Sequence, residues 1–393
     1  DLVTDLLLKF YGEERASERW TITALDVPEN VQGVMKLLQN KCFRAAVDFT
    51  GIYLKSLSAG VDAKPDTPET LQMMLVRLSS LSVLGLWEKA LHTLDVLGDL
   101  GRYGIDHESC DQSDRASGSS GPVDTLPFAL HLLAGVVPFK AGHEHDALDH
   151  IYGLWHRVRE QKARWDGKQG SEEFLVWEER EEKVAGVLVW ILVQLNEFQL
   201  ALDILSALPE PSQARDSEYR CRVGAYRLIY RARVHIAVGD ITAATDCTNE
   251  AEALTQPLLE KASAEDTQEA SIRTLRVDLL INKGNLLLSK GSFNDALKVF
   301  LSAQELAPND TTVVNNLGVA YVYLGRLSES IATSKALLNE KTARNEVPPS
   351  QLVLNLSTMH ELESSRSAER KQDLIPCVEN ITTDSYPVQA LKI

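Results

Sequence analysis

Two stretches near the C-terminus carry the same pattern of apolar and small residues, 34 positions apart: Leu280, Gly284, Leu287, Gly291 in the first and Val314, Gly318, Tyr321, Gly325 in the second. Within each stretch these positions are three or four residues apart, which predicts a helix with one apolar face. A Gly inside such a face leaves room for another helix to cross closely. That second helix is predicted from the next apolar and small positions, Ala296, Phe300 and Ala303, before Pro308.

A period of 34 residues is typical of the tetratricopeptide repeat, a hairpin of two helices. One such hairpin cannot bury its apolar face alone, so hairpins stack into a solenoid whose concave surface is open to other chains. The period therefore favours a binding function over catalysis.

The pattern of the second helix, an apolar residue followed three positions later by a small one, recurs along the rest of the chain. The pairs are Phe43 with Ala46, Trp87 with Ala90, Phe198 with Ala201, Ile241 with Ala244 and Leu327 with Ser330, and Ala147 with Ile151 forms a weaker copy. Glycines precede several of them, as at Gly85, Gly142 and Gly239, where a short turn between antiparallel helices needs a permissive backbone. We therefore predict an all-α fold, a right-handed solenoid of six to seven tetratricopeptide-like helical hairpins.

The repeats divide the chain into four segments. Residues 1–103 are expected to hold an N-terminal segment and the first two degenerate hairpins, and residues 123–345 the remaining repeats. Between them, residues 104–122 are rich in Asp, Ser, Gly and His and poor in apolar side chains, which predicts a disordered loop. Residues 346–393 are expected to form a C-terminal tail and a capping helix, whose apolar face is Leu352, Leu356, Met359 and Leu362.

Charge and hydropathy argue against several classes of partner. The 393 residues include 56 acids and 40 bases, a formal net charge of -16, which disfavours direct binding to nucleic acid or to anionic lipid. No window approaches the roughly 20 uncharged apolar residues of a membrane helix, and no signal segment opens the chain, so we expect a soluble cytoplasmic protein. Its five cysteines stand singly, without the short spacings of zinc or redox sites.

The densest titratable cluster does not have the geometry of a metal site. It comprises His143, His145, Asp146, Asp149, His150 and His156. Two histidines that share a zinc ion on a helix are four residues apart, whereas His145 and His150 are five apart and diverge around the helix. Phosphate-binding glycine loops and a serine-nucleophile elbow are also missing from the sequence. We therefore predict no metal, no cofactor, no catalytic residue and no enzyme activity.

The remaining candidate site is the concave groove. In the two clearest repeats the first helix presents Asn282, Asn285, Asn315, Asn316 and Tyr323 toward the inner surface of such a solenoid. Asn side chains both donate and accept, so a ladder of them could hold the backbone of an extended chain. The alternative is that they form hydrogen bonds within the solenoid. Co-chaperones of this repeat class hold a C-terminal carboxylate with two Asn and flanking cations, but Ile281, Glu346 and Ser350 stand at the cation positions.

Two C-terminal stretches carry a resemblance to a known family. They are LVLNLSTMHELESSRSAERKQ at residues 352–372, together with the later QALKI, and NNLGVAYVYLGRLSESI at residues 315–331. These resemble the C-terminal end and the last repeat of the subunit-twelve family of the trafficking protein particle (TRAPP) complex. The specific match is confined to the C-terminal part, and the rest of the chain is compatible with it as a series of degenerate hairpins.

The resemblance implies a non-catalytic scaffold subunit of a vesicle-tethering complex that activates Rab GTPases in endoplasmic reticulum to Golgi transport and in autophagy. Its partners would be other TRAPP subunits, with a Rab GTPase reached only indirectly through the complex, no nucleic acid and no direct membrane insertion. The protein would be cytoplasmic, at the periphery of endoplasmic reticulum and Golgi membranes. Because members often have a long N-terminal extension and this chain begins at Asp1 without Met, we expect it to be a fragment or a trimmed form.

Two other functions stay open. A free tetratricopeptide-repeat adaptor or co-chaperone that binds an extended peptide is the first alternative, and the missing cations count against it. A hydrolase within the irregular middle of the chain is the second, and no residue supports it.

Overall fold

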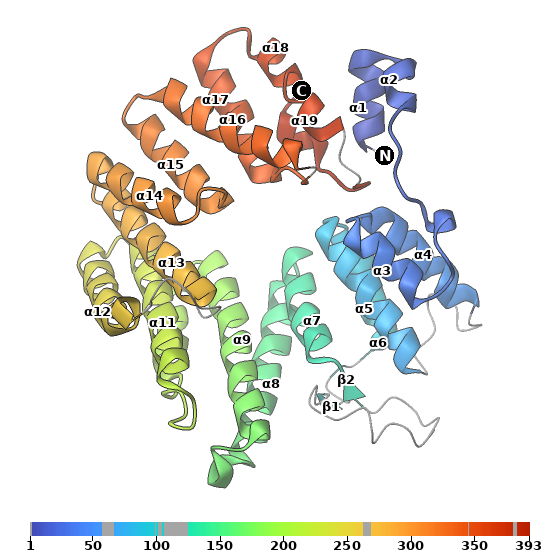
Figure 1. Ribbon diagram of the computed structural model, residues 1–393. Helices are drawn as coiled ribbons and strands as arrows, with labels where there is room; N and C mark the ends of the chain where they lie inside the picture. Colours follow the sequence, from blue (N-terminus) through green and yellow to red (C-terminus); the bar gives the residue numbers. More distant parts are fainter. Residues whose placement is uncertain are drawn as a thin grey trace. The chain divides into compact units, whose positions relative to one another are not determined.

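The structure is a computed structural model, and it describes residues 2–56, 67–98, 100, 104–105, 125–261, 269–344, 346–379 and 383–393. Helices in hairpin order make up most of these residues (Figure 1). The first helices of the repeats are α3 (Val31–Gln39), α5 (Pro68–Val83), α7 (Phe128–Lys140), α9 (Glu172–Gln194), α11 (Ser217–Val238), α13 (Glu269–Ser289) and α15 (Thr311–Tyr323). The second helices are α4 (Phe43–Ser56), α6 (Trp87–Leu97), α8 (Glu144–Ala163), α10 (Phe198–Ala207), α12 (Ile241–Lys261), α14 (Phe293–Leu306) and α16 (Leu327–Ala343).

The remaining elements lie mostly at the two ends of the chain. The N-terminal ones are α1 (Leu2–Tyr11), α2 (Glu13–Ser17) and the 3-10 turn η1 (Ala24–Asp26). The C-terminal ones are α17 (Ser350–Glu363), α18 (Ser367–Gln372), α19 (Pro376–Glu379) and η5 (Val388–Leu391), and η4 (Asp166–Lys168) lies between α8 and α9. The predicted all-α helical-repeat fold is confirmed.

Each of the seven turns between a first and a second helix contains one residue in the left-handed region, with φ between 56° and 89°. These residues are Lys41, Gly85, Gly142, Asn196, Gly239, Gly291 and Gly325. In every case the N–H of the following residue donates to the carbonyl five positions back, as Leu86 does to Leu81 at 3.0 Å. This is the Schellman motif, which satisfies the last carbonyls of the first helix.

The small residue of the second helix lies five positions after the left-handed residue and has no exposed surface. Ala46, Ala90, Ala147, Ala201, Ala244, Ala296 and Ser330 all occupy this position. The partner helix approaches so closely that a Cβ added at Gly135 would lie 2.1 Å from Cδ1 of Ile151. At Gly284 an added Cβ would lie 2.3 Å from Cε1 of Phe300. The predicted close crossing of the two helices is therefore a steric requirement.

The chain divides into two compact units. Unit 1 consists of Trp20–Glu197 with the segment Thr382–Ser385, and unit 2 of Leu2–Arg19, Phe198–Ile381 and Tyr386–Ile393. Three hairpins lie wholly in unit 1 and three wholly in unit 2. The remaining hairpin is divided, because α9 ends unit 1 and α10 begins unit 2. Helices α1 and α2 thus belong with the C-terminal repeats, although residues 1–103 were expected to form one segment with the first two hairpins.

In unit 2 the N-terminal helices pack into the core of the C-terminal cap. Val3 and Leu7 of α1 are fully buried in one apolar cluster with Val353 and Leu356 of α17. The guanidinium of Arg15 donates to both carboxylate oxygens of Glu379, at 2.5 and 2.7 Å. A segment that is remote in sequence therefore completes this end of unit 2.

The capping helix α17 packs against α16 as expected, with one difference in its apolar face. Leu352, Leu356 and Met359 are buried, but Leu362 is 64% exposed. His360 is fully buried instead, and its Nδ1 lies 3.3 Å from a carboxylate oxygen of Glu363. The buried face of α17 therefore ends about one turn earlier than predicted.

The predicted loop at residues 104–122 begins with a short strand. Residues Gly104–Ile105 (β1) pair in parallel with Thr125–Leu126 (β2), a two-residue ladder that the sequence analysis did not predict. Residues 106–122, the rest of the expected loop, lie outside the described residues.

Candidate functional site

The predicted Asn ladder lies on α13 and α15, the first helices of the last two hairpins, which contact each other in unit 2. Each hairpin exposes its first helix on one side because its second helix covers the other. The structure separates the five predicted residues into buried, paired and available side chains.

Asn282 is not available to a ligand. Its side chain is fully buried, and its Nδ2 donates to Oγ1 of Thr248 on α12, at 3.1 Å. Thr248 in turn donates to the carbonyl of Ala244, so this amide belongs to a hydrogen-bond chain inside the repeat stack. The predicted binding role of Asn282 is therefore wrong, and the internal alternative holds at this position.

Asn315 joins α15 to the cap. Its Oδ1 accepts a hydrogen bond from Nδ2 of Asn355 on α17, and the pair is partly buried. Asn355 also accepts from Nε2 of Gln351 at 3.2 Å. The contact between Asn315 and Asn355 joins the last repeat to the capping helix, whereas the bond between Gln351 and Asn355 lies within α17. Asn315 therefore already has a partner inside unit 2.

Asn285 and Asn316 remain candidates for binding a partner. Both side chains are half-buried, on α13 and α15 respectively, and neither forms a hydrogen bond with another described residue. A half-buried amide with unused donors and acceptors is suited to a polypeptide backbone, which offers both groups at each residue.

Tyr323 lies at the end of α15 with 62% of its surface exposed. Its ring stacks on Phe293, the first residue of α14, with centroids 4.8 Å apart and planes within 6°. Phe293 was not predicted for this role, although its place two residues after the turn glycine Gly291 puts it at the edge of the hairpin. The two rings form an aromatic edge beside the first helices.

Charges on this surface do not reproduce a carboxylate clamp. Ile281, at the first cation position, is 5% exposed and packs in the core. Glu346 accepts from Nζ of Lys341 at 3.0 Å. Lys283, two residues before Asn285 on α13, is paired with Glu252 at 2.9 Å. The surface is thus polar, but it has no pair of cations directed at a carboxylate.

The histidine cluster on α8 has local partners in the structure. His143 lies 3.5 Å from Asp146, and His156 lies 3.6 Å from Glu160. Nε2 of His150 lies 3.0 Å from the backbone carbonyl of His131 on α7. No group of metal-ligating side chains that could hold an ion occurs among the described residues.

His131 itself is a buried titratable residue that the sequence analysis overlooked. It is fully buried, its ring stacks with that of His150 at 6.5 Å, and its Nδ1 lies 3.5 Å from a guanidinium nitrogen of Arg157. Burial, together with the positive charge of Arg157, lowers the pKa of His131 to about 4. The imidazole is therefore neutral at physiological pH and acts as part of the core.

Helical hairpins with a buried small residue and a fixed turn define a helical-repeat protein of the tetratricopeptide type. Along its whole length the chain is similar to trafficking protein particle complex subunit 12, with 28% identity to the mouse protein and 26% to the human one. The resemblance predicted from the C-terminal stretches is thus confirmed and extends over all of the chain. The chain spans 48% of the mouse relative and 52% of the human relative, about half of their length.

Other comparisons add little. No family model matches the chain. Among solved structures, the tetratricopeptide-repeat domain of P58(IPK) covers 92% of this chain and 94% of its own, with 13% identity and a TM-score of 0.23. A human IFIT1 dimer with m7Gppp-AAAA covers 87% of this chain and 77% of its own, with 12% identity and a TM-score of 0.33. Within the described part of the chain, no helix has the length and apolar character needed to span a membrane.

Proposed function

We propose that this chain is a non-catalytic scaffold subunit of a TRAPP-type vesicle-tethering complex. The observation that carries the proposal is the similarity of the entire chain to subunit 12 of that complex in two mammals. A stack of helical hairpins suits such a role, because repeats of this kind offer long surfaces to other proteins. The described residues also contain no group of side chains suited to hold a metal ion.

The proposal extends to the cellular role. The chain would join the peripheral subunits of the assembly, and the assembly would activate Rab GTPases in endoplasmic reticulum to Golgi transport and in autophagy. The Rab GTPase would be reached only through other subunits. The protein would act in the cytoplasm at the surface of these membranes, without nucleic acid and without inserting into the bilayer.

The proposed docking surface is the exposed side of α13 and α15, with Asn285 and Asn316 as its polar contacts and Tyr323 at its edge. These amides are half-buried and make no hydrogen bond with another described residue. An extended segment of another subunit could pair its backbone with them. Each such hydrogen bond contributes about 0.5 to 1.5 kcal/mol, so the two together would affect assembly without deciding it alone.

The test is co-expression of the chain with its cognate TRAPP subunits, followed by affinity purification through the chain. The wild-type chain should recover a stoichiometric complex, and the double variant Asn285→Ala, Asn316→Ala should recover less of it while its helical circular dichroism is unchanged. A matched control is Asn249→Ala with Asn294→Ala, because both residues are exposed and lie on second helices.

Three outcomes separate the hypotheses. If the wild-type chain recovers no TRAPP subunit, the proposed function is wrong. If it recovers chaperones through their C-terminal tails instead, the chain is a free adaptor of the co-chaperone type. Full assembly by the double variant would leave the scaffold role intact but would exclude α13 and α15 as the docking surface.

A further inference from the structure

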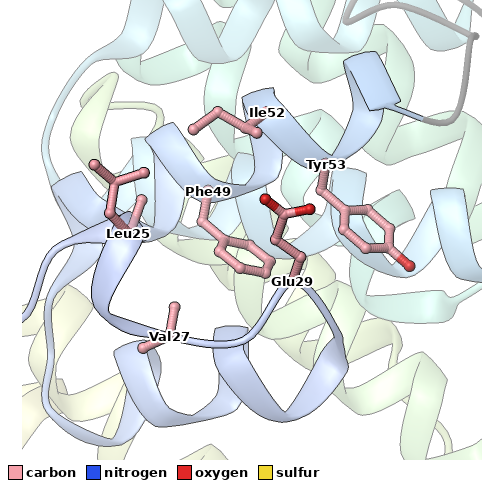
Figure 2. Close-up of a pocket in the computed structure, with 7 residues that line it drawn as sticks. Leu25, Val27, Glu29, Phe49, Ile52 and Tyr53 are labelled. Atoms are coloured by element: carbon pink, nitrogen blue, oxygen red, sulfur yellow. The ribbon is translucent and has the colours of Figure 1, made fainter.

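A small apolar pocket lies in unit 1, between the segment around η1 and helix α4. It has a volume of about 70 Å³ and is lined by Leu25, Val27, Glu29, Phe49, Ile52 and Tyr53, with Ala24 beside them (Figure 2). One water occupies roughly 30 Å³, so the pocket has room for the end of an aliphatic side chain.

The floor of the pocket is buried, but its rim is apolar and exposed. Phe49 and Val27 are 3% and 6% exposed, whereas Leu25 is 88% and Ile52 46% exposed. The rings of Phe49 and Tyr53 stack with their centroids 6.0 Å apart, which fixes one wall. Exposed apolar side chains gathered around a pocket mark an interaction site.

Helix α3, which contacts α4, also has exposed apolar side chains. Val31 and Met35 are 41% and 48% exposed, and because they are four residues apart they lie on one face of the helix. Four large apolar side chains are thus exposed within residues 25–52, and two of them, Leu25 and Ile52, line the pocket.

Glu29, the charged residue that lines the pocket, is acidic. Glu29 is exposed, and its carboxylate makes no hydrogen bond or ion pair with another described residue; in the view of Figure 2 it lies between Phe49 and Tyr53. On the far side of Tyr53, the phenolic hydroxyl donates to a carboxylate oxygen of Glu69 at 2.5 Å. An apolar floor with a carboxylate at its rim is complementary to an aliphatic side chain that has a Lys or Arg beside it.

We propose that this pocket, which we call the Phe49 pocket, is the docking site for a segment of another TRAPP subunit in which an aliphatic residue stands next to Lys or Arg. The aliphatic side chain fills the space above Phe49, and the neighbouring cation pairs with Glu29. The inference rests on the proposed function, since it takes the partner from the same complex.

The charge of the chain argues for this occupant over two others. A second copy of the chain carries the same net charge of -16 and the same acidic rim, so like charges would face each other across a self-interface. A membrane surface rich in anionic lipid would be repelled by the same carboxylates. Of these three occupants, only a basic segment can both fill the apolar pocket and pair with the carboxylate at its rim.

Photo-crosslinking tests the position of the partner. In the co-expressed assembly, Ile52 is replaced by benzoylphenylalanine, and the control carries the same group at Val83, an equally apolar residue that is 61% exposed on α5. We expect irradiation to join position 52, but not position 83, to a subunit segment that contains an aliphatic residue next to Lys or Arg. Cross-links from position 52 to a second copy, to lipid or to a segment without a cation would overturn the proposal.

Charge reversal tests the recognition itself. Glu29→Lys should weaken association with the cross-linked subunit about tenfold at low salt. The control Glu88→Lys, which reverses the charge of an exposed residue on α6, should leave the affinity unchanged. Equal affinity of both variants, or a lack of cross-links from position 52 in an assembled complex, would exclude the Phe49 pocket as the site while the proposed function stands. Failure of the wild-type chain to assemble with any TRAPP subunit would instead refute both.

Discussion

The carboxylate of Asp384 accepts a hydrogen bond from the backbone N–H of Ala45 at 2.7 Å, so a residue near the end of the chain caps a helix near its beginning. The other carboxylate oxygen accepts from the N–H of Arg44 at 3.2 Å. Helix α4 is preceded by Cys42, whose thiol is a poor acceptor, and therefore has no capping side chain of its own.

Asp384→Ala should lower the free energy of unfolding by about 0.5 to 2 kcal/mol, the usual effect of removing a helix cap. The measurement is urea denaturation followed by circular dichroism. Asp373→Ala is the matched control, because that residue is exposed and lies in the same C-terminal region. Equal unfolding curves for the Asp384 variant and the wild type would mean that α4 does not depend on this cap.

Lys41→Gly should stabilise the protein by about 0.5 to 1 kcal/mol, because Lys41 has a φ of 56°, a conformation that costs an L-residue energy and a glycine almost none. The carbonyl of Lys41, which accepts from Oγ1 of Thr383, is kept in the variant. The opposite exchange, Gly239→Lys at a φ of 88°, should destabilise the protein. Thermal unfolding of both variants checks the sign, and a lower melting temperature for Lys41→Gly contradicts the prediction.

Gly284→Ala should destabilise the protein by about 1 to 3 kcal/mol, since the new methyl group would lie 2.3 Å from the buried ring of Phe300 and force the hairpin apart. Gly186→Ala is the control: it is also helical, and an added Cβ there meets nothing within 4 Å. That variant should gain stability from the better helix propensity of Ala. If both variants melt alike, the close crossing at Gly284 is not a constraint.

The pKa of His131, lowered to about 4, predicts a specific loss of stability in acid. Between pH 6.5 and 4 the unfolded chain binds a proton at this residue and the folded chain does not, so the free energy of unfolding falls as the pH falls. One pH unit between the two pKa values corresponds to about 1.4 kcal/mol, so the loss approaches about 3 kcal/mol at pH 4. Above pH 6.5 this contribution is constant.

Urea denaturation of His131→Gln across this pH range should give a flatter profile than the wild type. His156→Gln, at an exposed site on α8, serves as the control and should retain the wild-type slope. The difference between slopes is informative even if His131→Gln is less stable at every pH. Parallel profiles for the wild type and the His131 variant would show that the histidine is protonated equally in both states.

The repeat frame could be predicted from sequence because it is local. A buried small residue and the apolar residue three positions before it depend only on helix geometry, and the frame at Ala46 and Ser330 follows the same rule as at Ala296. The turns at Lys41 and Asn196 were not predicted, because neither has a glycine at its left-handed position. Counting five positions back from each buried small residue would have found them.

Long-range contacts explain the features that the sequence did not predict. Asn282 and Asn285 are three residues apart on the same helix, but Asn282 is buried and donates to Thr248 on the neighbouring hairpin, whereas Asn285 is only half-buried. The cap at Asp384 and the ion pair of Arg15 with Glu379 join residues more than 300 positions apart. No periodic pattern in a single chain encodes such pairs.

The division of both termini between the two units limits how the protein can be dissected. An expression boundary between Glu197 and Phe198 would follow the main break in the chain, yet the N-terminal product would lack Thr382–Ser385 and the C-terminal product would lack Leu2–Arg19. Neither half would contain its complete set of contacts. A faithful minimal version of unit 2 needs its first helices supplied through a designed linker or circular permutation, and one of unit 1 needs the tail tetrapeptide added as a separate ligand.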